Sequence, residues 1–333
     1  MSAHRTDRWQ RLSLTSEALR GNPLGDPHER RLWVWSPADR SRRYPAVYVI
    51  QGMLGRVDAW FNVTSWTESY PDAIERIAPD AVVVLVDAFT AVGGSQFVDS
   101  AGTGRYHTYL CDEIVPFVDE RFPTLPEARH RGIQGKSSGG YGSMITPMLR
   151  PDLFGGLATH AGDALFELSY QNEFGAAARA LRDKYDGSYD RFWADFRSGR
   201  PVFADKSDAV LVNTYAMAAA YSARDDGTVE IPFDTDTGEL LPDVFERWLR
   251  WDPVRMAREP RHAETLRGLR GIWIDSGKGD EYWLDLGATA FNRVLGEIGV
   301  SDQTVHFELF DGTHGGITWR YPLALAWLVE RLS

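Results

Sequence analysis

A serine flanked by glycines stands at residues 135–139, which read G-K-S-S-G and match the pattern G-x-S-x-G. The pattern follows a short apolar run at residues 131–134 and precedes an apolar, helix-like run. In a sharp strand-to-helix turn that exposes a nucleophilic hydroxyl, larger side chains two residues to either side would collide with the backbone. Ser137 has glycines at both positions, whereas Ser138 has Lys136 two residues before it. We therefore expect Ser137 to be a nucleophile.

A serine hydroxyl needs a base and a third group that orients the base, and in one common arrangement these follow in the order serine, acid, histidine. His314 lies in a Gly-rich loop after the expected strand 304–309, and few other histidines fit this order. The acid is expected at Asp280, in the loop after strand 271–275; Asp275 and Glu281 compete with it.

Acyl transfer also needs two backbone N–H donors for the oxyanion that forms on the attacked carbonyl. The first is expected from Ser138, directly after the nucleophile. The second is expected from the loop that follows residues 46–50, where Gly52 allows a close approach of the backbone and Met53 or Leu54 offers its N–H.

Four further residues near these loops are candidates for substrate binding: Gln51, Lys136, His160 and Asp163. Lys136 is an unusual neighbour for a nucleophile. Its ammonium group could meet an anionic group of a substrate or a carboxylate of the chain, or its stem could be buried with the charge in solvent or in a structural ion pair.

Two other kinds of site fit the sequence less well. Residues 135–137 resemble the end of a phosphate-binding loop, but His130 occupies the position of the first required glycine. No H-E-x-x-H is present, and residues 234–238 lack the later acids of a calcium loop, so a hairpin tip between Ile231 and Leu241 is the better interpretation. We expect no metal and no cofactor.

The elements that must position these residues alternate between strand and helix. Short apolar runs without polar alternation predict buried parallel strands; they lie at residues 46–50, 81–86, 131–134, 156–160, 271–275 and 304–309. A helical pattern covers residues 106–122. The sequence therefore predicts an α/β fold with a two-faced, mostly parallel sheet. From residue 165 to 251 the pattern changes to helical segments rich in aromatic residues, so we expect a core at 1–164 and 252–333 and an inserted, mainly helical cap at 165–251. Aromatic residues at helical spacing are more often core than substrate contacts.

Composition restricts the class of protein. The 333 residues are 43% apolar and 25% charged, as in ordinary globular proteins. The net charge of −11 opposes non-specific binding to nucleic acid or to anionic membranes. Cys111 is the single cysteine, so no internal disulfide can form, and the first 40 residues carry Arg5 and six further arginines without a signal-like apolar run. We expect a cytoplasmic protein; a homo-oligomer stays open.

These residues resemble one family, the putative-esterase branch of the α/β-hydrolases, which includes esterase D (S-formylglutathione hydrolase), enterochelin esterase-like proteins and mycolyltransferases. The resemblance covers most of the chain outside the cap and is carried by residues 16–19, 44–52, 137–140, 275–281 and 312–314. It implies the α/β-hydrolase fold, with Ser137 as nucleophile and His314 as base. Residues 275–281 are especially similar to those of esterase D, whose acid lies three residues after the glycine, and this places the acid on Asp280. Gln51 and Lys136 depart from the residues that the family commonly has.

Three functions follow as hypotheses. The first is a serine esterase that hydrolyses a small-molecule carboxylic ester through an acyl-enzyme. The second is an acyltransferase that uses the same triad, and the third is a non-catalytic binding protein on a hydrolase fold. The sequence does not identify the ester.

Overall fold

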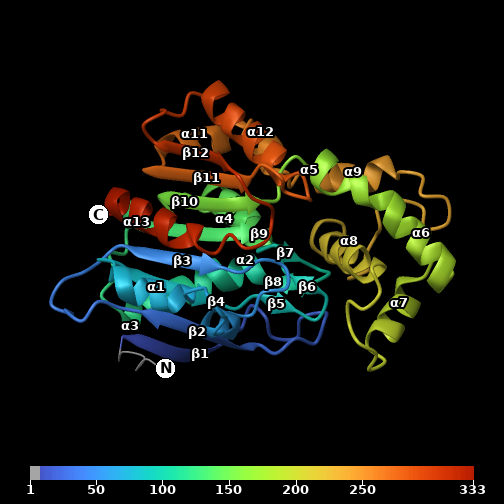
Figure 1. Ribbon diagram of the computed structural model, residues 1–333, viewed down its shortest axis with the longest axis horizontal. Coiled ribbons are helices and arrows are strands. Elements are labelled where there is room, and N and C mark those ends of the chain that lie inside the picture. Colours follow the sequence, from blue (N-terminus) through green and yellow to red (C-terminus); the bar gives the residue numbers. More distant parts are fainter. Residues whose placement is uncertain (1–7) are drawn as a thin grey trace.

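The computed structural model describes residues 8–333, and its centre is an eight-stranded sheet with the order β1-β2-β4-β3-β9-β10-β11-β12 (Figure 1). In this order the six strands from β4 to β12 run parallel to one another, whereas the β1–β2 and β2–β4 pairs are antiparallel. Residues 1–7 of the predicted core, with Arg5, lie outside the described residues. The strands are β1 (Trp9–Thr15), β2 (Glu29–Trp35), β3 (Ala46–Ile50), β4 (Val82–Val86), β9 (Arg131–Ser137), β10 (Gly156–Gly162), β11 (Gly271–Gly277) and β12 (Val305–Phe310).

All six predicted strands are present, and the predicted α/β-hydrolase fold is confirmed. β3 and β4 are buried along their whole length, as their continuous apolar sequences require of strands that are covered on both faces. The edge pair β1 and β2 was not predicted, because exposed polar or charged residues stand among the apolar ones in these two strands.

Alternate residues of the parallel strands support two apolar layers. Val47 and Val49 pack in one layer with helices α1 and α13, while Tyr48 and Ile50 pack in the other with α3, α4 and α12. The predicted helix at residues 106–122 consists of α2 (Tyr106–Thr108), a π-helical segment (Tyr109–Ile114) and α3. The helices around the sheet are α1 (Tyr70–Ile77), α3 (Val115–Arg121), α4 (Ser138–Leu149), α10 (Pro253–Met256), α11 (Pro260–Gly268), α12 (Leu284–Glu297) and α13 (Arg320–Leu332).

A group of helices lies beyond one end of the sheet in Figure 1, where the chain runs from green through yellow to orange. These helices are α5 (Phe166–Ser169), α6 (Phe174–Tyr185), α7 (Tyr189–Phe196), α8 (Ser207–Tyr221) and α9 (Pro242–Leu249). Their aromatic residues mostly contact one another: the rings of Phe174 and Trp248, for example, are 5.6 Å apart and buried. We call this group the cap, and its limits at residues 165 and 251 stay a prediction.

The predicted hairpin tip lies within the cap. Phe233 and Leu240 form an isolated antiparallel bridge, and Asp234 accepts hydrogen bonds from the backbone N–H groups of Asp236 and Thr237 between them. Within residues 8–333, no helix is both long enough and apolar enough to cross a membrane.

Candidate active site

Ser137 lies at a sharp turn between strand and helix. It is the last residue of β9, and α4 begins at the next residue. Its φ of 57° and ψ of −127° are unusual for a residue with a side chain, so the turn is strained. A Cβ on Gly135 would lie 2.4 Å from the backbone of Gly139, and a Cβ on Gly139 would lie 2.5 Å from the carbonyl oxygen of Ile50. The two flanking glycines are therefore required by the close approach of three backbone segments.

Asp280 and His314 come together from the loops after β11 and β12. Nδ1 of His314 lies 2.9 Å from Oδ2 of Asp280, whose other oxygen accepts a hydrogen bond from the backbone N–H of Tyr282. The Asp280 side chain is fully buried, while that of His314 is 13% exposed. Among the described residues, neither Nε2 of His314 nor the hydroxyl of Ser137 has a hydrogen-bond partner. Both groups are therefore available to a ligand.

The two competing acids have other partners. Glu281 accepts a hydrogen bond from the backbone N–H of His314 and so supports the loop. Asp275 is buried in β11 and bonds His160, Trp273 and Arg320. Burial would raise the pKa of Asp275, but these partners together hold it below its ordinary value.

A cavity of about 610 Å³ opens between the carboxyl ends of the strands and the cap. Ser137 and His314 both line it, as do all three residues considered for the oxyanion donors: Met53, Leu54 and Ser138. A Cβ on Gly52 would lie 3.6 Å from Cβ of Ser137, so this loop passes close to the serine. The backbone N–H groups of Met53 and Leu54 have no acceptor among residues 8–333, and that of Ser138 belongs to the free donors at the start of α4.

Asp163 lines the same cavity and connects the core to the cap. Its Oδ2 accepts hydrogen bonds from the hydroxyl of Tyr170 at 2.8 Å and from that of Ser138 at 3.3 Å. Burial raises the pKa of Asp163, and burial likewise raises the pKa of Glu173, which also lines the cavity and bonds Asn213. The cap side of the cavity thus offers carboxyl groups that are less acidic than usual.

Gln51 and Lys136 line the cavity on the core side. Gln51 is buried, and its Nε2 has no hydrogen-bond partner among the described residues. Burial lowers the pKa of Lys136, and the carboxylates of Asp280, Asp163 and Glu281 partly offset this effect.

His160 is not placed in the cavity, contrary to the expectation that it contacts substrate. Its side chain is fully buried between Asp275, which lies 2.7 Å from Nδ1, and Gln134, whose Nε2 lies 3.0 Å from Nε2 of His160. Its ring also packs against Tyr321 at 4.6 Å. His160 belongs to a structural network inside the sheet because its side chain points from β10 toward α13 rather than toward the strand end.

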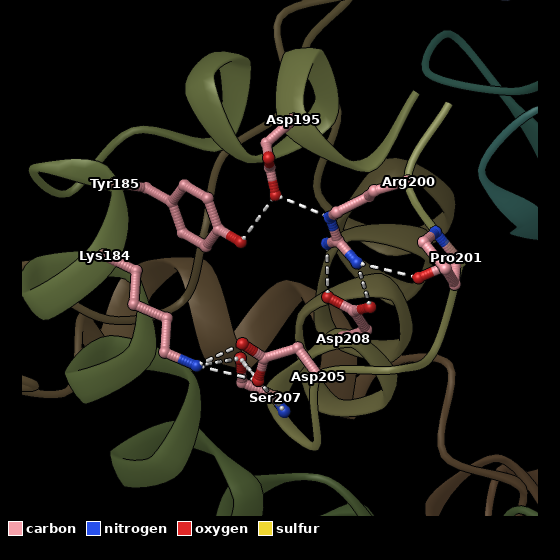
Figure 2. Close-up of polar contacts among 8 residues, drawn as sticks. All are labelled: Lys184, Tyr185, Asp195, Arg200, Pro201, Asp205, Ser207 and Asp208. Atoms are coloured by element: carbon pink, nitrogen blue, oxygen red, sulfur yellow. Dashed lines mark hydrogen bonds and ion pairs between the residues drawn. The ribbon is translucent and has the colours of Figure 1, made fainter. Parts of the chain in front are cut away.

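The cap contributes cavity residues that the sequence did not single out. Among them are Tyr170, Phe203 and Lys206. Figure 2 shows how the segment that carries Phe203 and Lys206 is held: Arg200 bonds Asp195 of α7 and both carboxylate oxygens of the buried Asp208 of α8. Lys184 of α6 bonds Asp205 in the same segment. No sequence spacing relates these residues to the serine, because the cap folds over the site from a separate stretch of chain.

The other kinds of site that the sequence brought up are not supported. Lys136 lies within β9 rather than at the start of a helix, so residues 130–137 do not form the loop that cradles phosphates. Within residues 8–333, no three His, Cys, Asp or Glu side chains are grouped so as to hold a metal ion.

Comparison with known proteins identifies a family and structures with a similar fold. The sequence profile of a family described as "Putative esterase" matches residues 27–327. Solved structures with a similar fold include a ferulic acid esterase (17% identity, TM-score 0.60, 98% of each chain covered) and an S-formylglutathione hydrolase from Agrobacterium tumefaciens (16%, 0.58, 98% of this chain and 95% of that one). An enterochelin esterase from Shigella flexneri is similar at 16% identity and a TM-score of 0.51, over 97% of this chain and 57% of that one.

Proposed function

Because this chain belongs to the putative esterase family, we propose that it is a serine esterase and hydrolyses a carboxylic ester through an acyl-enzyme on Ser137, with His314 as base and Asp280 as the acid that orients it. One observation carries the proposal: Ser137, at a strained turn, and His314, bonded to the buried Asp280, line one cavity. A nucleophile, a base and an orienting carboxylate in this relation define the triad arrangement.

In the proposed reaction the hydroxyl oxygen of Ser137 attacks the ester carbonyl while Nε2 of His314 accepts its proton. The negative charge that develops on the carbonyl oxygen is stabilised by the N–H of Ser138 and by that of Met53 or Leu54. His314 then gives the proton to the leaving alcohol, and the acyl group stays on Ser137. Water, deprotonated by His314, releases the carboxylic acid and restores the serine.

Asp280 acts through His314 in this scheme. Its carboxylate accepts a hydrogen bond from the Nδ1–H group, so the proton stays on Nδ1, Nε2 is free to act as base, and the imidazolium that forms is stabilised. The N–H of Tyr282 holds the other carboxylate oxygen, and the ring of Tyr282 packs edge-on against His314 at 4.9 Å. These contacts leave the imidazole little freedom to turn.

Labelling with a fluorophosphonate tests the proposal. We expect one adduct per chain, located on Ser137 by peptide mass spectrometry, and hydrolysis of at least one member of a panel of aryl, alkyl and thioesters. Absence of labelling together with absence of turnover would favour a non-catalytic binding protein. Transfer of the acyl group to an added alcohol in preference to water would identify an acyltransferase.

A further inference from the structure

Three residues that line the cavity each carry a hydrogen-bond donor that has no acceptor among residues 8–333. The donors are the amide Nε2 of Gln51, the indole Nε1 of Trp60 and the ammonium group of Lys136. We call these three residues the donor cluster. A buried donor without an acceptor destabilises the protein, so a ligand that supplies an acceptor gains binding energy there.

The topology places the donor cluster on one side of the cavity. Ile50 pairs with Gly135 across β3 and β9, so Gln51 and Lys136, the next residue of each strand, are neighbours at the sheet edge. Lys136 in turn pairs with His160 of β10. The ring of Tyr321 packs on His160 at 4.6 Å and on Trp60 at 5.0 Å, which brings the indole to the same side.

The carboxylates of the chain near Lys136 are already engaged. Asp280 accepts hydrogen bonds from His314 and Tyr282, and Asp163 accepts them from Tyr170 and Ser138. Glu281 accepts the backbone N–H of His314. None of them lies within 4.0 Å of the Lys136 ammonium group, so these acids influence its charge without forming an ion pair with it.

We propose that the donor cluster binds a carboxylate that the ester substrate carries in addition to the scissile ester. The inference rests on the proposed function, because it places this carboxylate beside Ser137. A carboxylate has two oxygens with about four acceptor sites and no donor of its own, so it can engage all three donors. Its charge also strengthens the hydrogen bond from Lys136.

Matched pairs of esters test the inference. For the acyl side we use 4-nitrophenyl hydrogen glutarate and the analogue in which a carboxamide replaces the free carboxylate. For the alcohol side we use 3-carboxyphenyl acetate and 3-carbamoylphenyl acetate. In at least one pair we expect the charged ester to have the higher kcat/KM, and the pair that shows this preference identifies the side of the ester that carries the carboxylate.

The variants are compared by the ratio of kcat/KM for the charged ester to that for the neutral one. We expect Lys136→Met to lower this ratio about 30-fold, as the loss of a charge-assisted hydrogen bond implies. Trp60→Phe removes the indole N–H and keeps most of the ring, and we expect it to lower the ratio about threefold. This variant replaces Lys136→Met as the test if Lys136→Met does not fold. Lys184→Met is the matched control: Lys184 is an exposed lysine of the cap that is not among the residues lining the cavity, so its replacement leaves the ratio unchanged.

Two results overturn the inference while the proposed function stands: hydrolysis of the neutral esters with a ratio that Lys136→Met does not alter, or an equal fall of the ratio in Lys184→Met. If no ester is hydrolysed, titration calorimetry with the glutarate monoamide anion, or with 3-hydroxybenzoate, decides. If these anions bind the wild type and bind Lys136→Met about 30-fold more weakly, the donor cluster is supported and only the esterase mechanism is refuted. Equal affinities, or no binding, refute the donor cluster.

Discussion

The carboxylate of Asp280 lies 2.9 Å from Nδ1 of His314, although the two residues are 34 positions apart in the sequence. A second aspartate–histidine pair, Asp275 and His160, lies inside the sheet at 2.7 Å. The two pairs differ at the opposite nitrogen of the imidazole. Nε2 of His160 faces the side-chain amide of Gln134, whereas the ring of His314 lines the cavity. Of the two pairs, the one with His314 is therefore the pair that we propose as base and acid.

This difference predicts the order of effects in two variants. Asp280→Asn should lower kcat by about 10⁴, because the amide no longer holds the imidazole in the tautomer that accepts a proton. Asp275→Asn should lower stability more than kcat, because it breaks a buried network with His160 and Arg320. The measurement is kcat per folded molecule, with urea unfolding in parallel. A larger loss of kcat in Asp275→Asn would move the acid to Asp275.

Ser137→Ala should abolish turnover while the protein keeps its fold. The loss of the nucleophile in a triad enzyme costs about 10⁶ in kcat, and the Ser137 hydroxyl has no partner among the described residues whose loss would destabilise the protein. Ser138→Ala is the matched control, since it removes a neighbouring hydroxyl that bonds Asp163 but keeps the backbone N–H. If Ser138→Ala lost activity and Ser137→Ala retained it, the nucleophile would be Ser138.

The sequence predicts the strands that carry the site because these strands are buried on both faces. A continuous apolar run such as β4 is stable only in the interior of a globular protein. The residues that follow its carboxyl end lie at the edge of the sheet where the site is formed. The edge strand β1 escapes this signal, since its exposed face carries polar and charged residues. The same reasoning predicts correctly that His160 lies near the site along the chain, but its side chain is fully buried between Asp275 and Gln134 and does not reach the cavity.

Residues that reach the site from elsewhere carry no sequence signal. Trp60 and Tyr321 are more than 250 residues apart in the chain, yet their rings are 5.0 Å apart beside the cavity. Their contact depends on how α13 packs on the sheet. Gln51 and Lys136 stand out in the sequence because they depart from the family pattern. The sequence does not show that they are neighbours, because this depends on the pairing of β3 with β9.

The preference for a charged ester should depend on pH in one direction. Burial lowers the pKa of Lys136 from its ordinary value of 10.5, so its ammonium form is present at low pH and is lost as the pH rises through the lowered pKa. The ratio of kcat/KM for charged and neutral esters should therefore fall at a pH below that at which an exposed lysine titrates. The groups that face Lys136 are Asp280, Asp163, Glu281 and the proposed base His314.

The ratio cancels the titration of the base, because both esters use it. Lys136→Met should give a low ratio that does not change across the same alkaline range. A wild-type ratio that rises with pH, or that falls equally in Lys136→Met, would contradict the assignment of the fall to Lys136.

The cap segment that carries Phe203 and Lys206 should depend on Arg200 far more than on Lys184. Arg200 forms two hydrogen bonds with Asp208, whose side chain is fully buried, whereas the pair of Lys184 and Asp205 is largely exposed. Arg200→Met leaves a buried carboxylate without its partner, so we expect the free energy of unfolding to fall by about 3 kcal/mol. Lys184→Met should lower it by less than about 1 kcal/mol.

Urea unfolding of both variants checks these values, and steady-state kinetics checks the effect on the site. Because Phe203 and Lys206 line the cavity, Arg200→Met should also raise KM more than it lowers kcat. If the loss of stability comes from the unpaired charge of Asp208, the double variant Arg200→Met with Asp208→Asn should recover part of it, since the neutral amide is less costly to bury. No recovery in the double variant would mean that Arg200 acts through packing on Phe196, which its guanidinium group approaches at 5.5 Å, and not through the ion pair.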